Sequence, residues 1–589
     1  MGIVNALTVI FLISVFGYYL GYSILIKRAN AWFPILYIAS SVLLIYLFGL
    51  IGLLKAGLYV LLAGGIIFIP FLIFRKKKEI SRVIRSVVTD PSLIYMIAGV
   101  FWVYAITKNV GISHADDFSH WYRICKMMHF ESAYPTMPDM SFTTYAPGTA
   151  TWIWIITEVT GFSPDRCLFA HSLINLAALN SFFSLIREGK GKASKISVFV
   201  FACIMSVTLC SMDVNTYCLL TDTTIALVPM AAVFLILSME GKAGKTDYIL
   251  ITVLMCFEIL IKVSGIPFVV FAGVLLAKRY KDASDTRVKS ILKMLIPSAV
   301  PLIVFYAYVI RANMVFGHLE LAGQGFSVTR FIAMFLIKSG EQIKAITGRF
   351  FYEIFVLWGD VSMQVRLVWL VFAVAAVSLY LLRKDRDFAP LRKLMASLFA
   401  FFVIYAVLLL LTYLFSMYSN EADAEHLNSF YRYMGSVTIF VYGCGMYLLY
   451  GILSCRTSKI EYAGCAAMCA ASLAITVLMF DAGFVIGYGH YKTEEVFTTN
   501  AWDYLNKYAQ ERYEYNEDVY LVIYNPEDVA DDYELKIKLA SEVYFRSNNI
   551  NILSVDDIGS GEEDIIGLDD IDHVVILGDQ DLDLESFLP

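Results

Sequence analysis

Apolar runs of membrane-spanning length recur along most of the chain, with short polar connections between them. Because a helix needs roughly 20 mostly apolar residues to cross a bilayer, the pattern predicts an all-α polytopic membrane protein with about fourteen transmembrane helices. The expected spans are 4–26, 32–54, 56–74, 92–108, 168–186, 195–212, 217–238, 247–261, 265–277, 291–312, 365–382, 394–415, 435–454 and 462–487. The two spans beside Lys262 are alternatively a re-entrant hairpin. Four helices then occupy region 1–110, and the others form a core over 168–487.

Lysine and arginine gather in alternate connections between these spans. The basic connections are 27–28, 75–78, 190–195, 242–245, 278–293, 383–393 and 456–459. Because cytoplasmic loops carry the excess of Lys and Arg in membrane proteins, we expect all seven on the cytoplasmic side. The N-terminus, the loops 111–167, 313–364 and 416–434, and the C-terminal tail are then extracytoplasmic.

Loop 313–364 contains an amphipathic pattern. From Phe331 to Phe355, apolar residues recur at helical spacing with Lys338, Lys344 and Arg349 between them. The pattern predicts a helix that lies in the membrane interface, and a plain anchor is the alternative role for it.

The tail differs from the rest of the chain in charge. From Val485 onward there are 6 Lys and Arg against 25 Asp and Glu, a balance of −19, whereas the preceding part has 40 against 27, a balance of +13. Apolar runs of strand length lie at 519–524, 550–555 and 573–578, and helical spacing lies at 534–546. Residues 488–589 are therefore expected to form a small, acidic, extracytoplasmic α/β domain with a parallel sheet.

Composition limits the class of protein. With 58% hydrophobic and 17% charged residues and a mean hydropathy of +0.65, the chain is too apolar for a soluble protein of 589 residues. The ten cysteines are scattered singly, which indicates neither a disulfide framework nor a zinc site. Cys125 and Cys167 share loop 111–167 and are a candidate pair. We expect the lipid bilayer as a partner and no nucleic acid.

Chemistry-bearing side chains concentrate in loop 111–167. The candidates there are His114, Asp116, Asp117, His120, Trp121 and Tyr145. On an α-helix Asp116 and His120 share one face, as Asp117 and Trp121 do, so a short helix would aim an acid and an imidazole at one cleft. A solvated turn or a helix cap is the alternative interpretation of the acidic pair.

Two cations interrupt or border apolar segments on the same side. A lysine such as Lys262 inside a membrane costs roughly 2.5–3.5 kcal/mol on insertion scales, so it normally faces a cavity or a partner. A structural pair with Glu258, one helical turn earlier, is the alternative for Lys262. Arg432 precedes a span and is followed by Tyr433, and snorkelling in an aromatic belt is its alternative role.

These features together resemble the GT-C integral membrane glycosyltransferases. The resemblance lies in the segments 114–121 and 145–149 and, more weakly, in 430–433, with a large first outer loop and an extracytoplasmic C-terminal domain around them. Four predicted spans precede the acidic loop in this chain, whereas the family pattern has one.

The resemblance implies an enzyme that takes a sugar from a polyprenyl-phosphate carrier at the outer membrane face and passes it to a glycan, a lipid or a protein. Asp116 or Asp117 would supply the catalytic base, and Lys262, Arg432 and the basic segment 338–349 would stabilise the leaving phosphate. Inversion at the anomeric carbon is expected from one base without a covalent intermediate. Further candidates for substrate binding are His114, His120, Trp121, Tyr145 and Tyr433. A divalent cation is an alternative aid, because carboxylates and an imidazole can ligate one.

Two other functions stay open. A polysaccharide polymerase or ligase would transfer a whole glycan from a diphosphate lipid. A multi-pass transporter belongs to a different class, in which Asp222, Glu258 and Lys262 would line a path between broken helices at the membrane midplane. No internal repeat joins the two halves of the sequence, which argues against the transporter.

The predicted topology can be tested with single cysteines in a variant without the native ones. Ser113→Cys and a cysteine in segment 535–545 should react with a membrane-impermeant thiol reagent in intact cells, because both sites are expected outside. Lys192→Cys should react only after the membrane is permeabilised. Labelling is read on a gel, and the reverse pattern would exclude an extracytoplasmic acidic loop.

Overall fold

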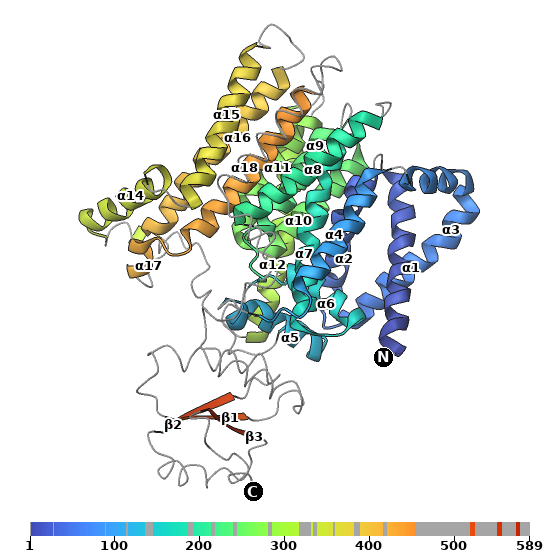
Figure 1. The fold of residues 1–589 in the computed structure, drawn as a ribbon, viewed down its shortest axis with the longest axis horizontal. Coiled ribbons are helices and arrows are strands. Elements are labelled where there is room, and N and C mark those ends of the chain that lie inside the picture. The colour runs from blue at the N-terminus through green and yellow to red at the C-terminus, as the bar shows by residue number, and fades with distance from the viewer. Residues whose placement is uncertain are drawn as a thin grey trace.

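The structure is a computed structural model of the whole chain, and it describes most of residues 2–453 together with three strands of the tail. Within the first part the gaps are 27–28, 89, 113–115, 136–144, 187–191, 214–217, 240–243, 281–285, 317–331, 334–337, 357–359, 382–388 and 416–420. Figure 1 draws such residues as a thin grey trace.

The described chain up to Leu453 is almost entirely helical (Figure 1). Its first elements are α1 (Gly2–Leu25), α2 (Ala29–Gly49), α3 (Leu54–Val88), α4 (Pro91–Thr107), the π-helical turn η1 (Asp117–Trp121), α5 (Tyr122–Glu131), α6 (Gly148–Thr160), α7 (Pro164–Leu179), the 3-10 turn η2 (Asn180–Leu185) and α8 (Lys192–Asp213). The next are α9 (Thr224–Ser238), α10 (Lys245–Ile261), η3 (Val263–Gly265), α11 (Ile266–Tyr280), α12 (Arg287–Phe316), α14 (Gly340–Phe355), α15 (Asp360–Leu381), α16 (Ala389–Phe415), α17 (Glu421–His426) and α18 (Phe430–Leu453).

Seven of the described helices are long and apolar enough to cross a membrane. Their apolar stretches are Ala6–Ile24, Asn30–Gly49, Leu54–Phe74, Pro164–Leu185, Leu295–Val315, Leu391–Phe415 and Phe430–Gly451, each of which coincides with an expected span. Five more expected spans coincide with shorter apolar helices in α4, α8, α9, α11 and α15, and the span 247–261 coincides with α10. The last expected span, 462–487, lies outside the described residues. The chain is thus a multi-pass helical membrane protein, and the count of fourteen stays a prediction.

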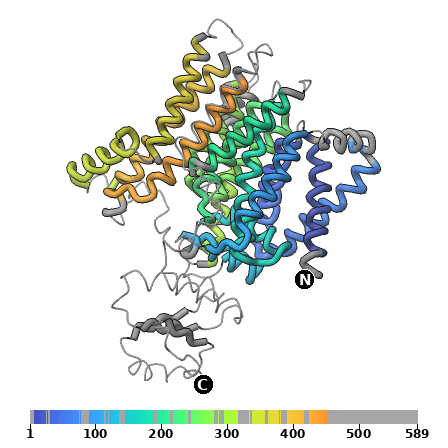
Figure 2. Tube along the Cα trace, in the orientation of Figure 1, coloured from blue at the N-terminus to red at the C-terminus, as the bar shows by residue number. Residues whose placement is uncertain are grey.

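The core lies between helices that are far apart in the sequence. In α18, 94% of the apolar stretch is buried, against 17% in α1. α18 packs on α9, α15 and α16, and α10 packs on α2, α9 and α12. The blue N-terminal helices and the yellow trace of α15 and α16 lie on opposite sides of this core (Figure 2). Helices α1, α3, α12 and α16 expose many large apolar side chains, the kind of surface that hydrocarbon covers in a membrane.

The expected span 217–238 is wrong at its start. α9 begins only at Thr224, and residues 218–223 are non-helical and end in a turn at Asp222. The backbone of this segment bonds to distant side chains instead of forming a helix. The Leu219 N–H donates to a carboxylate in η1, and the Asp222 carbonyl accepts from the Ser436 hydroxyl at 2.7 Å. Tertiary partners therefore satisfy the groups that a longer helix would have paired.

The predicted loop 111–167 is largely helical, because it contains η1, α5 and α6. α6 is buried along nearly its whole length and packs on α2, α5, α7 and α10. Gly148 permits this packing, since a Cβ there would lie 2.5 Å from the Leu260 carbonyl oxygen in α10. Arg311 of α12 donates to the Tyr134 carbonyl at 3.0 Å. The acidic pair therefore sits on a packed scaffold and not on a solvated loop.

The predicted helix 331–355 is present in its second part as α14, which begins only at Gly340; Lys338 and Ser339 before it are non-helical. It begins with a capping box, in which the Ser339 hydroxyl accepts from the Gln342 N–H and the Gln342 side chain accepts from the Ser339 N–H. α14 packs on α15, α16 and α17, whereas Phe351 and Phe355 stack on each other and are half exposed. Apolar groups on the packed and the exposed side fit a helix in the membrane interface.

The three predicted strands of the tail are present. They are β1 (Val519–Tyr524), β2 (Ile550–Val555) and β3 (His573–Leu577). Both neighbours of β1 run parallel to it, in the order β2-β1-β3, with Val519 opposite Ile550 and His573. The predicted helix 534–546 lies outside the described residues, so the α/β assignment stays a prediction, as does the side of the membrane on which the tail lies.

Helices α1 and α3 cross at glycines. A Cβ on Gly17 would lie 1.8 Å from the Gly65 carbonyl oxygen, and a Cβ on Gly65 would lie 2.3 Å from the Ser14 carbonyl oxygen. The two backbones are therefore in direct contact, as small residues permit between membrane helices. The Ser14 hydroxyl also donates to the Leu61 carbonyl at 3.2 Å.

Gly65→Ala should force α1 away from α3 and lower the free energy of unfolding by about 1–3 kcal/mol, the usual cost of overpacking. Gly21→Ala on α1 is the matched control, because nothing lies within 4 Å of a Cβ at that position. The midpoint of thermal unfolding in detergent should fall for the first variant and not for the second. Equal midpoints would contradict the close crossing.

Candidate functional site

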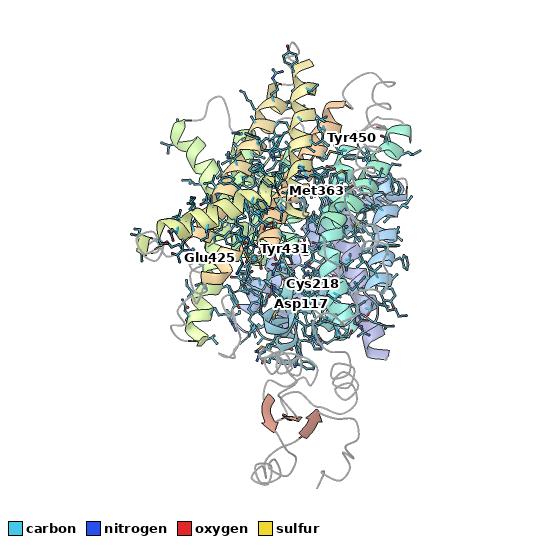
Figure 3. The ribbon with its side chains drawn as sticks, turned by 60° about the vertical axis from the view of Figure 1, so that its left-hand side comes forward. Asp117, Cys218, Met363, Glu425, Tyr431 and Tyr450 are labelled. Carbon is cyan, nitrogen blue, oxygen red and sulfur yellow. The ribbon has the colours of Figure 1, made fainter. Side chains whose placement is uncertain are left out.

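Four charged side chains from four distant segments meet in the helical body. They are Asp116 just before η1, Asp222 just before α9, Lys262 between α10 and η3, and Arg432 in the first turn of α18. Figure 3 labels three neighbours of this group, Asp117, Cys218 and Tyr431, in one half of the body, and labels Tyr450 in the other half. We call the four charged residues Asp116, Asp222, Lys262 and Arg432 the charge cluster.

Arg432 joins the two carboxylates of the charge cluster. Its Nε and Nη2 donate to Asp222 Oδ2 at 3.1 and 2.8 Å, and its Nη1 donates to Asp116 Oδ2 at 2.8 Å. The Arg432 side chain is 10% exposed, so these are sheltered, charge-assisted hydrogen bonds. Arg432 thus points into the protein, and the alternative that it snorkels in an aromatic belt is wrong.

Lys262 lies where α10 ends, in an extended backbone conformation with φ −160° and ψ 142°. Its Nζ donates to Asp222 Oδ1 at 2.8 Å and lies 5.5 Å from the centroid of the Tyr433 ring. The alternative pairing of Lys262 with Glu258 is therefore wrong. Both carboxyl oxygens of Glu258 are buried and have no hydrogen-bond partner within the described part of the chain.

Asp222 is the centre of the charge cluster. One of its oxygens accepts from Lys262 and the other from Arg432, and the residue is 3% exposed. With Asp116, the cluster has two carboxylates and two cations, so its formal charges balance. Removing one member of such a buried arrangement leaves a charge uncompensated, which costs about 3–5 kcal/mol in measured cases.

Asp117 has surroundings different from those of its neighbour Asp116. It is fully buried, and its two oxygens accept from the Leu219 N–H at 3.1 and 3.0 Å. Burial raises the pKa of Asp117 well above its usual range; the Leu219 hydrogen bond opposes this, and the charge of Asp116 adds to it. Asp117 therefore fastens η1 to the segment before α9, whereas the Asp116 side chain is 33% exposed and faces Arg432.

Three of the predicted binding residues form an aromatic group beside η1. Trp121 and Tyr145 stack with ring centroids 4.9 Å apart and an angle of 12°, and His120 lies 5.1 Å from Tyr145. The turn η1 is π-helical, which changes the direction of successive side chains from that in an α-helix. Asp116 accepts a hydrogen bond from Arg432, whereas the His120 ring packs on Tyr145. This differs from the prediction that Asp116 and His120 share one helix face.

Apart from Asp117, which is buried against Leu219, the predicted site residues that the structure describes fall into two groups. Asp116, Lys262, Arg432 and Tyr433 meet around Asp222, and His120, Trp121 and Tyr145 form the aromatic group. His114 lies outside the described residues.

The sequence pattern assigned Asp222 only to a transport path and missed its place at the centre of the site, and it missed Ser436 entirely. An acid inside the apolar run 217–238 was the available signal, because a lone carboxylate is expensive in a membrane.

The described residues give little support to a metal site in this region. Among the described residues, no three His, Cys, Asp or Glu side chains are close enough together to hold a metal ion. The carboxylates of Asp116 and Asp222 are already paired with protein cations. Cys125 and Cys167 are buried free thiols, so the candidate disulfide is wrong. A divalent cation stays a prediction, with His114 its untested ligand.

Comparison with known proteins adds no relative: no family model, curated protein or solved structure matches this chain. Function has to be argued from the charge cluster and its surroundings.

Asp117→Asn should become more stable relative to the wild type as the pH rises from 4 to 7. Below about pH 3 the carboxyl is protonated in both the folded and the unfolded wild type, because the pKa of an unfolded aspartate is about 3.9. Between that pKa and the raised pKa of the buried group, the unfolded carboxyl ionises while the buried one keeps its proton, so the wild type loses up to about 1.4 kcal/mol of stability per pH unit. The asparagine has no proton to lose, so its profile lacks this slope. Unfolding midpoints measured in detergent across this range test the slope, and parallel profiles would contradict it.

Proposed function

We propose that the protein is a membrane glycosyltransferase that moves a sugar from a polyprenyl-phosphate donor to a glycan, lipid or protein acceptor, with inversion at the anomeric carbon. The contact that carries this proposal is the one between Asp116 and Arg432. A partly exposed carboxylate suited to take a proton lies 2.8 Å from a guanidinium suited to hold a phosphate. Displacement with inversion needs a base on one face of the anomeric carbon and a cation at the departing phosphate on the other face, so both groups have to face one site.

Asp116 is the base in this proposal. A general base has to reach the acceptor hydroxyl within hydrogen-bond distance, and the Asp116 side chain is 33% exposed, whereas Asp117 is fully buried. Burial also keeps the pKa of Asp117 high, which favours its protonated form. Asp117 serves the reaction by holding η1 against the segment before α9.

Arg432 and Lys262 stabilise the leaving phosphate. Both donate to Asp222 at 2.8 Å, so their charged ends lie on either side of one carboxylate and are close enough to share a ligand. As the acceptor oxygen bonds to the anomeric carbon, the bond from that carbon to the phosphate oxygen breaks and its electron pair moves to the phosphate. The hydroxyl proton passes to Asp116. Cations aimed at the charge that develops lower the barrier.

The stacked rings of Trp121 and Tyr145 suit the sugar. Tyr145 is the partly exposed ring of this pair, whereas Trp121 and His120 are each 4% exposed and support it from the buried side. Tyr433 lies beneath the Lys262 ammonium group and completes the wall on the side of α18. These residues would orient the donor between base and cations.

The membrane setting belongs to the same proposal. We assign the site to the extracytoplasmic face, because the seven basic connections alternate with the loops that contain it. The full arrangement has about fourteen spans and an acidic α/β domain at the C-terminus, on the same side as the site.

Asp116→Asn should reduce turnover about 10²–10⁴-fold, the usual contribution of a general base. Arg432→Ala should also reduce turnover, and Arg432→Lys should restore it only partly, because an ammonium group lacks the planar fork. Lys262→Met should behave like Arg432→Ala. The readout is the lipid-linked sugar pool, measured by mass spectrometry in cells and with purified protein.

Arg166→Ala is the matched control for loss of a cation, since Arg166 is exposed at the start of α7 and away from the charge cluster. Donors with one and with two phosphates separate a single-sugar transferase from a polymerase or ligase. An unchanged lipid-linked sugar pool with and without the protein would exclude all three enzymes.

One observation favours a transporter as the second candidate. Helix α10 breaks at Lys262, and one turn earlier the buried Glu258 carboxyl is without a hydrogen-bond partner in the described structure. Broken helices and intramembrane acids are typical of ion-coupled transport. Substrate flux into vesicles without consumption of any lipid-linked sugar would support this candidate over the enzyme.

A further inference from the structure

Arg432 has two carboxylate partners that differ in how firmly they are held. Asp222 is 4% exposed at its side chain, and it also accepts from Lys262. Asp116 is 33% exposed and meets only the outer nitrogen, Nη1, of the guanidinium group. The buried Asp222 therefore holds the inner edge of the guanidinium group, which is formed by Nε and Nη2. The outer edge, at Nη1, faces the partly exposed Asp116.

An anion that enters the site would meet Arg432 at this outer edge. Nε and Nη2 are both engaged by Asp222 Oδ2, which leaves Nη1 as the donor whose partner can be replaced without breaking the inner contact. Either a phosphate oxygen or a carboxylate oxygen can accept a charge-assisted hydrogen bond from Nη1. The two anions therefore compete for the outer edge of the guanidinium group, where a phosphate oxygen would also reach the second hydrogen of Nη2.

We propose that the phosphate of the lipid donor replaces Asp116 on Nη1 of Arg432 and thereby releases the Asp116 carboxylate to act as the base. This inference rests on the proposed glycosyl transfer and adds its regulation. Before the donor binds, the base is tied to the cation that the leaving group will need. Asp222 holds the guanidinium in place while its outer partner is exchanged.

The exchange fixes the order of events at the site. The donor phosphate binds first, and Asp116 then turns from Arg432 toward the acceptor hydroxyl. In the transfer step the hydroxyl proton goes to Asp116, the new bond forms at the anomeric carbon, and the electron pair of the broken bond goes to the phosphate on Arg432. An acceptor that arrives before the donor meets a base that is still paired with Arg432.

Competition for Nη1 has an unusual consequence for variants of Asp116. Asp116→Asn should lower turnover and yet bind a lipid phosphate about tenfold more tightly than the wild type, because the competing charge is removed. Asp116→Ser should show the same gain. Asp247→Asn, in the first turn of α10 and at the opposite end of that helix from Lys262, removes one negative charge away from the site and should leave the affinity unchanged.

Affinity is measured by titrating farnesyl phosphate into the purified full-length protein in detergent micelles, with farnesol as the uncharged reference. A double-mutant cycle separates exchange on Arg432 from general repulsion between anions. In an Arg432→Ala background, Asp116→Asn should change the affinity by less than about twofold, since the contested position no longer exists. Thermal unfolding checks that each variant is folded.

The outcomes separate this inference from the proposed function. Equal or weaker binding by folded Asp116→Asn and Asp116→Ser would overturn the exchange and leave glycosyl transfer standing. A full gain that persists in the Arg432→Ala background would also overturn it, because repulsion alone would then account for the gain. Failure of the wild type and of both Asp116 variants to bind farnesyl phosphate would overturn the exchange and the proposed function together.

Discussion

The guanidinium group of Arg432 holds the parts of this molecule that matter for function in one arrangement. It ties η1, through Asp116, to α18 and, through Asp222, to the segment before α9. Lys262 adds the break between α10 and η3 to the same network. Because water is largely excluded, each of these charges depends on the others for its solvation. The acidic loop and three separate helices are consequently held together by a single set of ion pairs.

The two neighbouring acids at the start of η1 show how burial gives similar side chains different tasks. Asp117 is fully buried and accepts from a backbone N–H, which makes it part of the scaffold. Asp116 is one residue away, is partly exposed and faces a cation. Consecutive side chains of a helical turn point in different directions, which gives the two acids different surroundings. A pair of acids in a sequence is thus a poor guide to which one does chemistry.

The membrane helices could be predicted from the sequence because each needs a long apolar run, and that requirement is local. The start of α9 could not, since residues 218–223 stay non-helical through bonds to side chains about 100 and 200 residues away in the chain, the Asp117 carboxylate and the Ser436 hydroxyl.

Asp116, Lys262 and Arg432 were predictable as site candidates because charge is rare in apolar surroundings. Their common partner Asp222 was not, because pairing is a property of the fold. Helices α5 and α6 inside loop 111–167 were not predicted, because neither contains an apolar run long enough to cross a membrane.

The spacing of the charge cluster along the chain bears on how the protein is made. Asp222 and Lys262 are 40 residues apart, whereas Arg432 follows Asp222 by 210 residues and Asp116 by 316. During synthesis α9 and α10 enter the bilayer with an acid and a base that neutralise each other, which reduces the cost of each in lipid. Arg432 arrives with α18, after all the other described helices. A nascent or truncated chain that ends before α18 therefore has Asp222 paired with Lys262 but no guanidinium group for Asp116, and the charge cluster is complete only when α18 docks.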